Sequence, residues 1–69
     1  MSELLRLLVP GARFYVEGER AQMEVIEVRH PVERVPVVHC WELEGPARNR
    51  TKRMKRAFQL GKLMGVMPD

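Results

Sequence analysis

The chain has 69 residues, of which 45% are hydrophobic and 30% are charged, and its net charge at neutral pH is +3. This length allows one domain, residues 1–69, without a large enclosed active site, because a domain of this size buries only about 60% of its unfolded surface. The composition is that of a folded globular protein rather than a disordered chain, which would be poorer in aliphatic residues.

The residues that form disulfides and metal sites are scarce. The chain contains one cysteine, Cys40, and two histidines, His30 and His39. A single cysteine cannot form an internal disulfide, and these three residues do not make a tetrahedral metal site. We therefore expect no metal, no cofactor and a reducing, cytoplasmic environment. The apolar N-terminus is interrupted by Arg6 and is too short for a signal peptide or a membrane span.

The first third of the chain predicts a short N-terminal element followed by a β-hairpin. Residues 2–9 form either an N-capped turn of helix or an edge strand, ended by the Pro-Gly pair that follows them. Arg13–Val16 and Gln22–Arg29 have the aromatic and β-branched content of strands, with a polar turn between them. Because Val25 and Ile26 are adjacent, the second strand must be covered on both faces or contain a bulge.

The middle of the chain predicts a loop and a third strand. Residues 30–36 include Pro31 and Pro36, and a regular central strand cannot contain a proline at either position. The strand at 37–43 alternates between two faces, one with Val37, His39, Trp41 and Leu43 and the other with Val38, Cys40 and Glu42. We expect Trp41 to be the core anchor. The Gly-Pro pair after Glu44 predicts a turn.

The last third predicts an amphipathic helix. From Met54 onward, residues at three- and four-residue steps form one apolar stripe, and basic residues fill the opposite side. The stripe contains Met54, Ala57, Phe58, Gly61, Met64 and Gly65. The helix starts either after a cap at Asn49 or Thr51, or near Met54 after a short edge strand at 48–53.

The order of these elements predicts an α+β fold. We expect a small, strongly bent antiparallel sheet, open or closed into an SH3-like partly open barrel, with the C-terminal amphipathic helix covering it. The segment Gly11–Gly18 followed by Glu24–Val28 resembles the first hairpin of small SH3-like barrels found in nucleic-acid and ribosome-associated proteins. This resemblance is confined to that hairpin and implies no site residues.

The strongest functional signal is a basic cluster near the C-terminus. Six of the twelve Lys and Arg residues fall within nine positions, without a carboxylate among them: Arg48, Arg50, Lys52, Arg53, Lys55 and Arg56. Residues 1–47 carry five basic and eight acidic groups, whereas residues 48–69 carry seven and one. A positive field concentrated in this way attracts a polyanion or an acidic protein face.

We interpret the basic cluster as the phosphate-binding surface of a non-enzymatic nucleic-acid-binding accessory domain, which contacts the backbone of DNA or RNA. The alternative is a small protein-binding inhibitor or adaptor of phage or plasmid type, which docks on an acidic face of a host enzyme or complex. A third reading is a solvated face that pairs with the chain's own carboxylates or with those of a second copy, which leaves a homodimer open.

Two further ligand classes are disfavoured. The only aromatic residue near the basic cluster in sequence, Phe58, falls on the apolar stripe, so we expect no base stacking. A stripe rich in Gly and Ala suits packing against a sheet better than insertion into a membrane.

The sequence contains no constellation of catalytic residues. His39 and Cys40 are neighbours in a predicted strand and point to opposite faces, so the histidine cannot activate the thiol. Glu24 and Glu27 also point apart and do not form an acid/base pair. We expect a packed Cys40, a partly buried His39 and no enzymatic activity.

Overall fold

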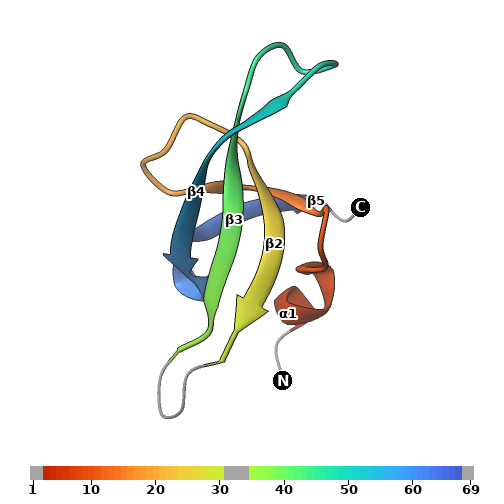
Figure 1. Ribbon diagram of the computed structural model, residues 1–69. Helices are drawn as coiled ribbons and strands as arrows, with labels where there is room; N and C mark the ends of the chain where they lie inside the picture. Colours follow the sequence, from red (N-terminus) through yellow and green to blue (C-terminus); the bar gives the residue numbers. More distant parts are fainter. Residues whose placement is uncertain (1–2, 31–34, 68–69) are drawn as a thin grey trace.

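The computed structural model describes residues 3–30 and 35–67 and consists almost entirely of antiparallel β-sheet (Figure 1). Its elements in chain order are α1 (Glu3–Leu7), β1 (Arg13–Val16), β2 (Met23–Arg29), β3 (Val37–Glu44), β4 (Thr51–Gln59), the 3₁₀ turn η1 (Leu60–Lys62) and β5 (Leu63–Met67). The five strands form one sheet in the order β4-β3-β2-β1-β5. Because β5 returns to pair with β1, the sheet bends around a single core, and β4 and β5 are its two edges.

The predicted α+β fold with a C-terminal amphipathic helix is wrong. Residues 51–59 form the edge strand β4, and one 3₁₀ turn separates it from β5. The apolar residues at helical spacing do not form a buried stripe, since Met54, Ala57 and Gly61 are all exposed. Eight cross-strand pairs with β3 satisfy the backbone of this segment in place of helical hydrogen bonds. For residues 48–53, the edge-strand alternative holds from Thr51 onward.

The predicted hairpin of β1 and β2 is confirmed, with β1 at the predicted residues and β2 starting one residue later than predicted. The register between β2 and β3 shifts between Val25 and Glu27, so the adjacent apolar residues are accommodated by a bulge. The N-terminal segment takes the helical alternative as α1. The predicted loop at 30–36 falls partly on residues 31–34, which lie outside the described residues.

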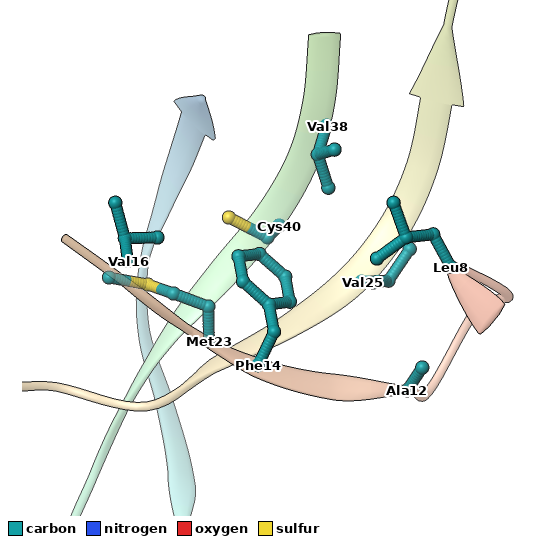
Figure 2. Close-up of a cluster of buried hydrophobic side chains, with 8 residues drawn as sticks. All are labelled: Leu8, Ala12, Phe14, Val16, Met23, Val25, Val38 and Cys40. Atoms are coloured by element: carbon teal, nitrogen blue, oxygen red, sulfur yellow. The ribbon is translucent and has the colours of Figure 1, made fainter. Parts of the chain in front are cut away.

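One apolar cluster fills the inner face of the bent sheet (Figure 2). Phe14 lies at its centre with no exposed surface, and the surrounding side chains come from β1, β2, β3 and the segment after α1. These are Leu8, Ala12, Val16, Met23, Val25, Val38 and Cys40. The strict alternation of buried and half-buried residues along β1 shows that only one face of that strand contributes to the core.

Trp41 is not the core anchor that the sequence predicts. The buried face of β3 is formed by Val38, Cys40 and Glu42, whereas Trp41 is half-buried on the opposite, outer face. The predicted alternation holds from Val37 to Glu42, and the inner set is the one that contains a carboxylate. It breaks at Leu43, which is buried although it was expected on the same face as Trp41. Glu42 can be buried because two arginines neutralise it.

Candidate functional site

The basic cluster lies on the hairpin formed by β3 and β4, which projects beyond the rest of the sheet (Figure 1). Arg48 and Arg50 belong to the connecting turn, and the other four residues, Lys52, Arg53, Lys55 and Arg56, belong to β4. All six are therefore carried by a single hairpin, with Arg48 at its exposed tip.

The turn of this hairpin requires glycine at its first position. Gly45 has a φ of +96°, and a Cβ added there would lie 2.9 Å from the backbone oxygen of Asn49. The Asn49 backbone N–H donates to the carbonyl of Pro46 at 2.9 Å, and Arg50 Nη1 donates to the carbonyl of Gly45 at 2.8 Å. Arg50 is thus partly occupied in closing the turn.

On the inner side of the hairpin, two arginines are engaged by carboxylates. Arg53 Nη1 lies 2.8 Å from Glu42 Oε2, and Arg56 Nη1 lies 2.5 Å from Glu42 Oε1 and 3.1 Å from Glu19 Oε1. The hydrogen bond to Glu19, reinforced by the one to Glu42, raises the pKa of Arg56 above its ordinary value. These guanidinium groups hold β4 to β3 and to the turn between β1 and β2, so they are less available to an external anion.

On the outer side, two lysines flank Trp41. The Nζ atoms of Lys52 and Lys55 lie 5.6 Å and 5.4 Å from the centroid of the Trp41 ring, within the range of a cation–π interaction. Lys55 is the direct cross-strand partner of Trp41. The expectation that no aromatic residue lies near the basic cluster is therefore wrong.

On β2, the strand on the other side of Trp41 from β4, the residue next to the ring is a carboxylate paired with an arginine rather than a further free cation. Glu24 of β2 is the cross-strand neighbour of Trp41, and its Oε1 lies 3.4 Å from the Nε of Arg13 on β1. Along β3, the next outer residue, His39, faces Glu27, which already forms an ion pair with Arg29. The positive side of the outer face is therefore the side of β4.

The structure divides the six predicted site residues into two functional groups. Among the described residues, Arg53 and Arg56 form ion pairs, and Arg50 bonds within the turn. The other three, Arg48, Lys52 and Lys55, are exposed and form no ion pair with a described residue. Trp41 is the residue that the sequence interpretation missed. Pairing the two segments directly across the Gly-Pro turn would have placed Trp41 opposite Met54. A register shift between Glu42 and Leu43 brings it opposite Lys55 instead, and the sequence gives no signal for that shift.

The predicted packed cysteine is confirmed. Cys40 has no exposed surface, and its thiol donates to the backbone carbonyl of Arg56 at an S···O distance of 3.6 Å. Burial raises the pKa of Cys40 to about 11, so the nucleophilic thiolate is not formed at neutral pH. His39 is half-buried on the opposite face of β3, because successive residues of a strand point to opposite faces.

This buried thiol predicts a specific loss of stability at high pH. An ordinary cysteine loses its proton near pH 9.0, whereas native Cys40 retains it up to about pH 11. The unfolded state is therefore favoured as the pH rises through this window, while below it the contribution of Cys40 to stability is complete. We expect urea denaturation to show a larger loss of unfolding free energy between about pH 8 and about pH 10.5 for the wild type than for Cys40→Ala. Equal losses in the two proteins would contradict the prediction.

Neither a metal site nor a membrane-spanning helix is found in the described part of the chain. Residues 3–30 and 35–67 contain no group of three or more His, Cys, Asp or Glu side chains placed to hold a metal ion. No helix within the same residues has the length and apolar character needed to cross a membrane.

No protein-family model, curated protein or solved structure matches this chain.

Proposed function

We propose that this protein is a non-enzymatic nucleic-acid-binding accessory domain that acts in the cytoplasm. Its contact surface is the hairpin surface, defined by Trp41, Arg48, Lys52 and Lys55. The observation that carries the proposal is the accumulation, on one projecting hairpin, of three exposed cations without a carboxylate partner among the described residues. Phosphate groups supply the missing counter-charges, and the field of the hairpin favours their approach.

The ion pairs of β4 reduce the number of phosphates that the hairpin can bind. If only Arg48, Lys52 and Lys55 contact phosphates, the logarithm of the binding constant should fall with the logarithm of salt concentration with a slope of about −2 for a single strand. Engagement of all six basic residues would double this slope to about −4. The salt dependence of binding therefore measures how many of the six cations are available.

The alternative function is a small inhibitor or adaptor of phage or plasmid type that docks on an acidic face of a host protein. Its support is the position of β4 at the edge of the sheet, where the outer backbone groups have no strand partner among the described residues. An acidic strand could pair there. We rank this function second because lysine and arginine on an edge strand usually prevent such pairing.

The test is a titration of short RNA and DNA oligonucleotides with the protein, followed by fluorescence anisotropy at several salt concentrations. In the triple variant Arg48→Gln, Lys52→Gln and Lys55→Gln, we expect affinity at low salt to fall by a factor on the order of 10 to 100. The salt slope should fall toward zero. The reason is the loss of three phosphate contacts with little change in the folded protein, since all three side chains are exposed.

A charge-matched control separates local contacts from overall charge. The variant Arg6→Gln, Arg20→Gln and Lys62→Gln also removes three exposed cations, all outside the hairpin. We expect it to lose much less affinity than the hairpin variant. An equal loss in both variants, or no salt-dependent binding by the wild type, would defeat the proposal. A stoichiometric protein partner that persists after nuclease treatment would favour the adaptor function.

A further inference from the structure

We infer that Trp41 is a base-stacking site and that the nucleic-acid ligand is single-stranded. This inference rests on the proposed function and specifies its ligand class. The bases would lie over the outer face of β3 at Trp41, and the phosphates would follow β4 toward the tip of the hairpin.

The position of Trp41 is the first argument. The ring lies on the outer face of the sheet and retains exposed surface, whereas the two phenylalanines, Phe14 and Phe58, lie in the core or pack against it. The ammonium groups of Lys52 and Lys55 both lie within 6 Å of the centroid of this ring. A stacking aromatic next to cations that track a backbone is the combination that single-strand-binding surfaces use.

The Trp41 ring can stack on an unpaired base but not on the bases inside a duplex. In a duplex the faces of the bases are covered by their neighbours, so a side chain on a sheet surface can contact only phosphates, sugars and base edges. An unpaired base offers its face for stacking on an aromatic ring. A duplex would therefore use only the cations of the hairpin surface, whereas a single strand would use the cations and Trp41 together.

The third argument is the balance of free energies when a base replaces the lysines. Each cation–π contact at an exposed site is weak, because water screens the ammonium charge. Stacking of a base on an aromatic side chain is the stronger of the two kinds of contact. The displaced ammonium groups of Lys52 and Lys55 also remain charged and gain phosphate contacts, which offset the loss of the ring. The exchange therefore favours the ligand.

The charges around Trp41 also fix the side on which the backbone runs. Glu24 borders the ring on β2, and its pairing with Arg13 leaves no net attraction for phosphate there. On the β4 side, Lys52 and Lys55 border the ring and Arg48 lies beyond them at the tip. The phosphates of a bound strand consequently lie along β4 rather than across the sheet.

The first test uses intrinsic fluorescence, because Trp41 is the only tryptophan in the chain. We expect oligo(dT) or oligo(U) at low salt to quench the fluorescence in a saturable way as the base stacks on the ring. Heparin, a polyanion without bases, should bind the cations but cause much less quenching. Equal quenching by heparin and by the oligonucleotides would overturn the inference, since displacement of the lysines would then explain the signal.

The second test compares two substitutions of Trp41. Trp41→Leu keeps an apolar side chain but cannot stack, and we expect it to weaken oligo(dT) binding by about 5- to 100-fold while duplex binding hardly changes. Trp41→Phe keeps a stacking face and should retain most of the preference for single strands. Circular dichroism checks that both variants are folded, and the duplex affinity serves as an internal control, because general damage to the hairpin would weaken both ligands.

The outcomes separate this inference from the proposed function. Salt-dependent binding with the same ratio of single-strand to duplex affinity in the wild type, Trp41→Leu and Trp41→Phe would overturn the stacking site but leave the nucleic-acid-binding function standing. Failure of every nucleic acid to bind at low salt would defeat both. A loss of single-strand preference in Trp41→Leu that Trp41→Phe restores would support the inference.

Discussion

Replacement of Phe14 with alanine is expected to reduce the unfolding free energy by about 3–5 kcal/mol. Phe14 has no exposed surface and lies at the centre of the apolar cluster, so truncation leaves a cavity that β1, β2 and β3 all border (Figure 2). A domain of this length has a total stability of roughly 3–10 kcal/mol, so the substitution should remove between about a third and all of it. Urea denaturation followed by far-UV circular dichroism measures the loss.

A neighbouring aromatic residue provides the control. Tyr15 follows Phe14 in β1 but points to the opposite face and is half-buried there. Its ring packs near Gly65 of β5, where an added Cβ would lie 3.7 Å from Tyr15 Cδ2. We expect Tyr15→Ala to reduce the unfolding free energy by less than half the amount found for Phe14→Ala. An equal or larger loss would mean that the outer face of β1, rather than the inner cluster, dominates the stability.

The first three strands were predictable because their signals are local. The alternation of Arg13–Val16 matches the observed burial. The adjacent apolar residues Val25 and Ile26 indicated either burial on both faces or a bulge, and β2 contains the bulge. The Gly-Pro turn after Glu44 is equally explicit, since Gly45 takes a positive φ. In each case the residue types and their spacing decide the structure without reference to distant parts of the chain.

The last strands were not predictable in this way, because their structure depends on tertiary pairing. β4 has few β-branched or aromatic residues, and its side chains are mostly exposed, so neither propensity nor burial alternation identifies a strand. Backbone pairing along the whole length of β3 determines the outcome instead. The helical spacing from Met54 arose by coincidence, and Gly61 within it has a low helix propensity.

The candidate site was predicted in composition but not in arrangement. The six basic residues do lie on one hairpin, and the reading in which the cluster pairs with the chain's own carboxylates holds for Arg53 and Arg56, which meet Glu42 eleven and fourteen positions earlier. The sequence did not indicate which of the six arginines and lysines would form these pairs. The contact of Lys55 with Trp41 is equally non-local. Treating 51–59 as a strand would have placed these residues on one hairpin, but the register shift between Glu42 and Leu43 is what brings Lys55 opposite Trp41. The arrangement of the site therefore depends on strand pairing and on an irregularity in it, and neither has a local signal in the sequence.

Replacement of Glu42 with glutamine is expected to reduce the unfolding free energy by about 1–3 kcal/mol, because hydrogen bonds to charged groups contribute about that much. Only 6% of the Glu42 side chain is exposed, and each of its oxygens accepts a hydrogen bond from a different arginine. Glutamine keeps one accepting oxygen, but its amide group would direct N–H donors at the second guanidinium. Two neighbouring cations would then lie close together without a carboxylate between them.

Glu44→Gln is the matched control for this prediction. Glu44 lies two residues further along β3 with 58% of its side chain exposed, and its Oε2 is 3.9 Å from Arg53 Nε. An exposed ion pair of this length contributes about 0–1 kcal/mol, so the control should be close to wild type in urea denaturation. Similar effects of the two substitutions would mean that Glu42 does not neutralise the inner side of the hairpin.

The Glu42→Gln variant also tests the division of the basic cluster, because stability and binding should change in opposite directions. Loss of the carboxylate leaves Arg56 held only by Glu19 and Arg53 only by the exposed Glu44, and it removes one negative charge from the hairpin. A folded variant should therefore bind oligo(dT) at least as tightly as the wild type. Its salt slope should become steeper than the wild-type value of about −2, toward about −3.5 for five phosphate contacts at a single strand. Anisotropy titrations at several salt concentrations measure both quantities. A slope that stays near the wild-type value would mean that these two arginines cannot reach phosphates even when released, and that phosphate contacts are restricted to Arg48, Lys52 and Lys55.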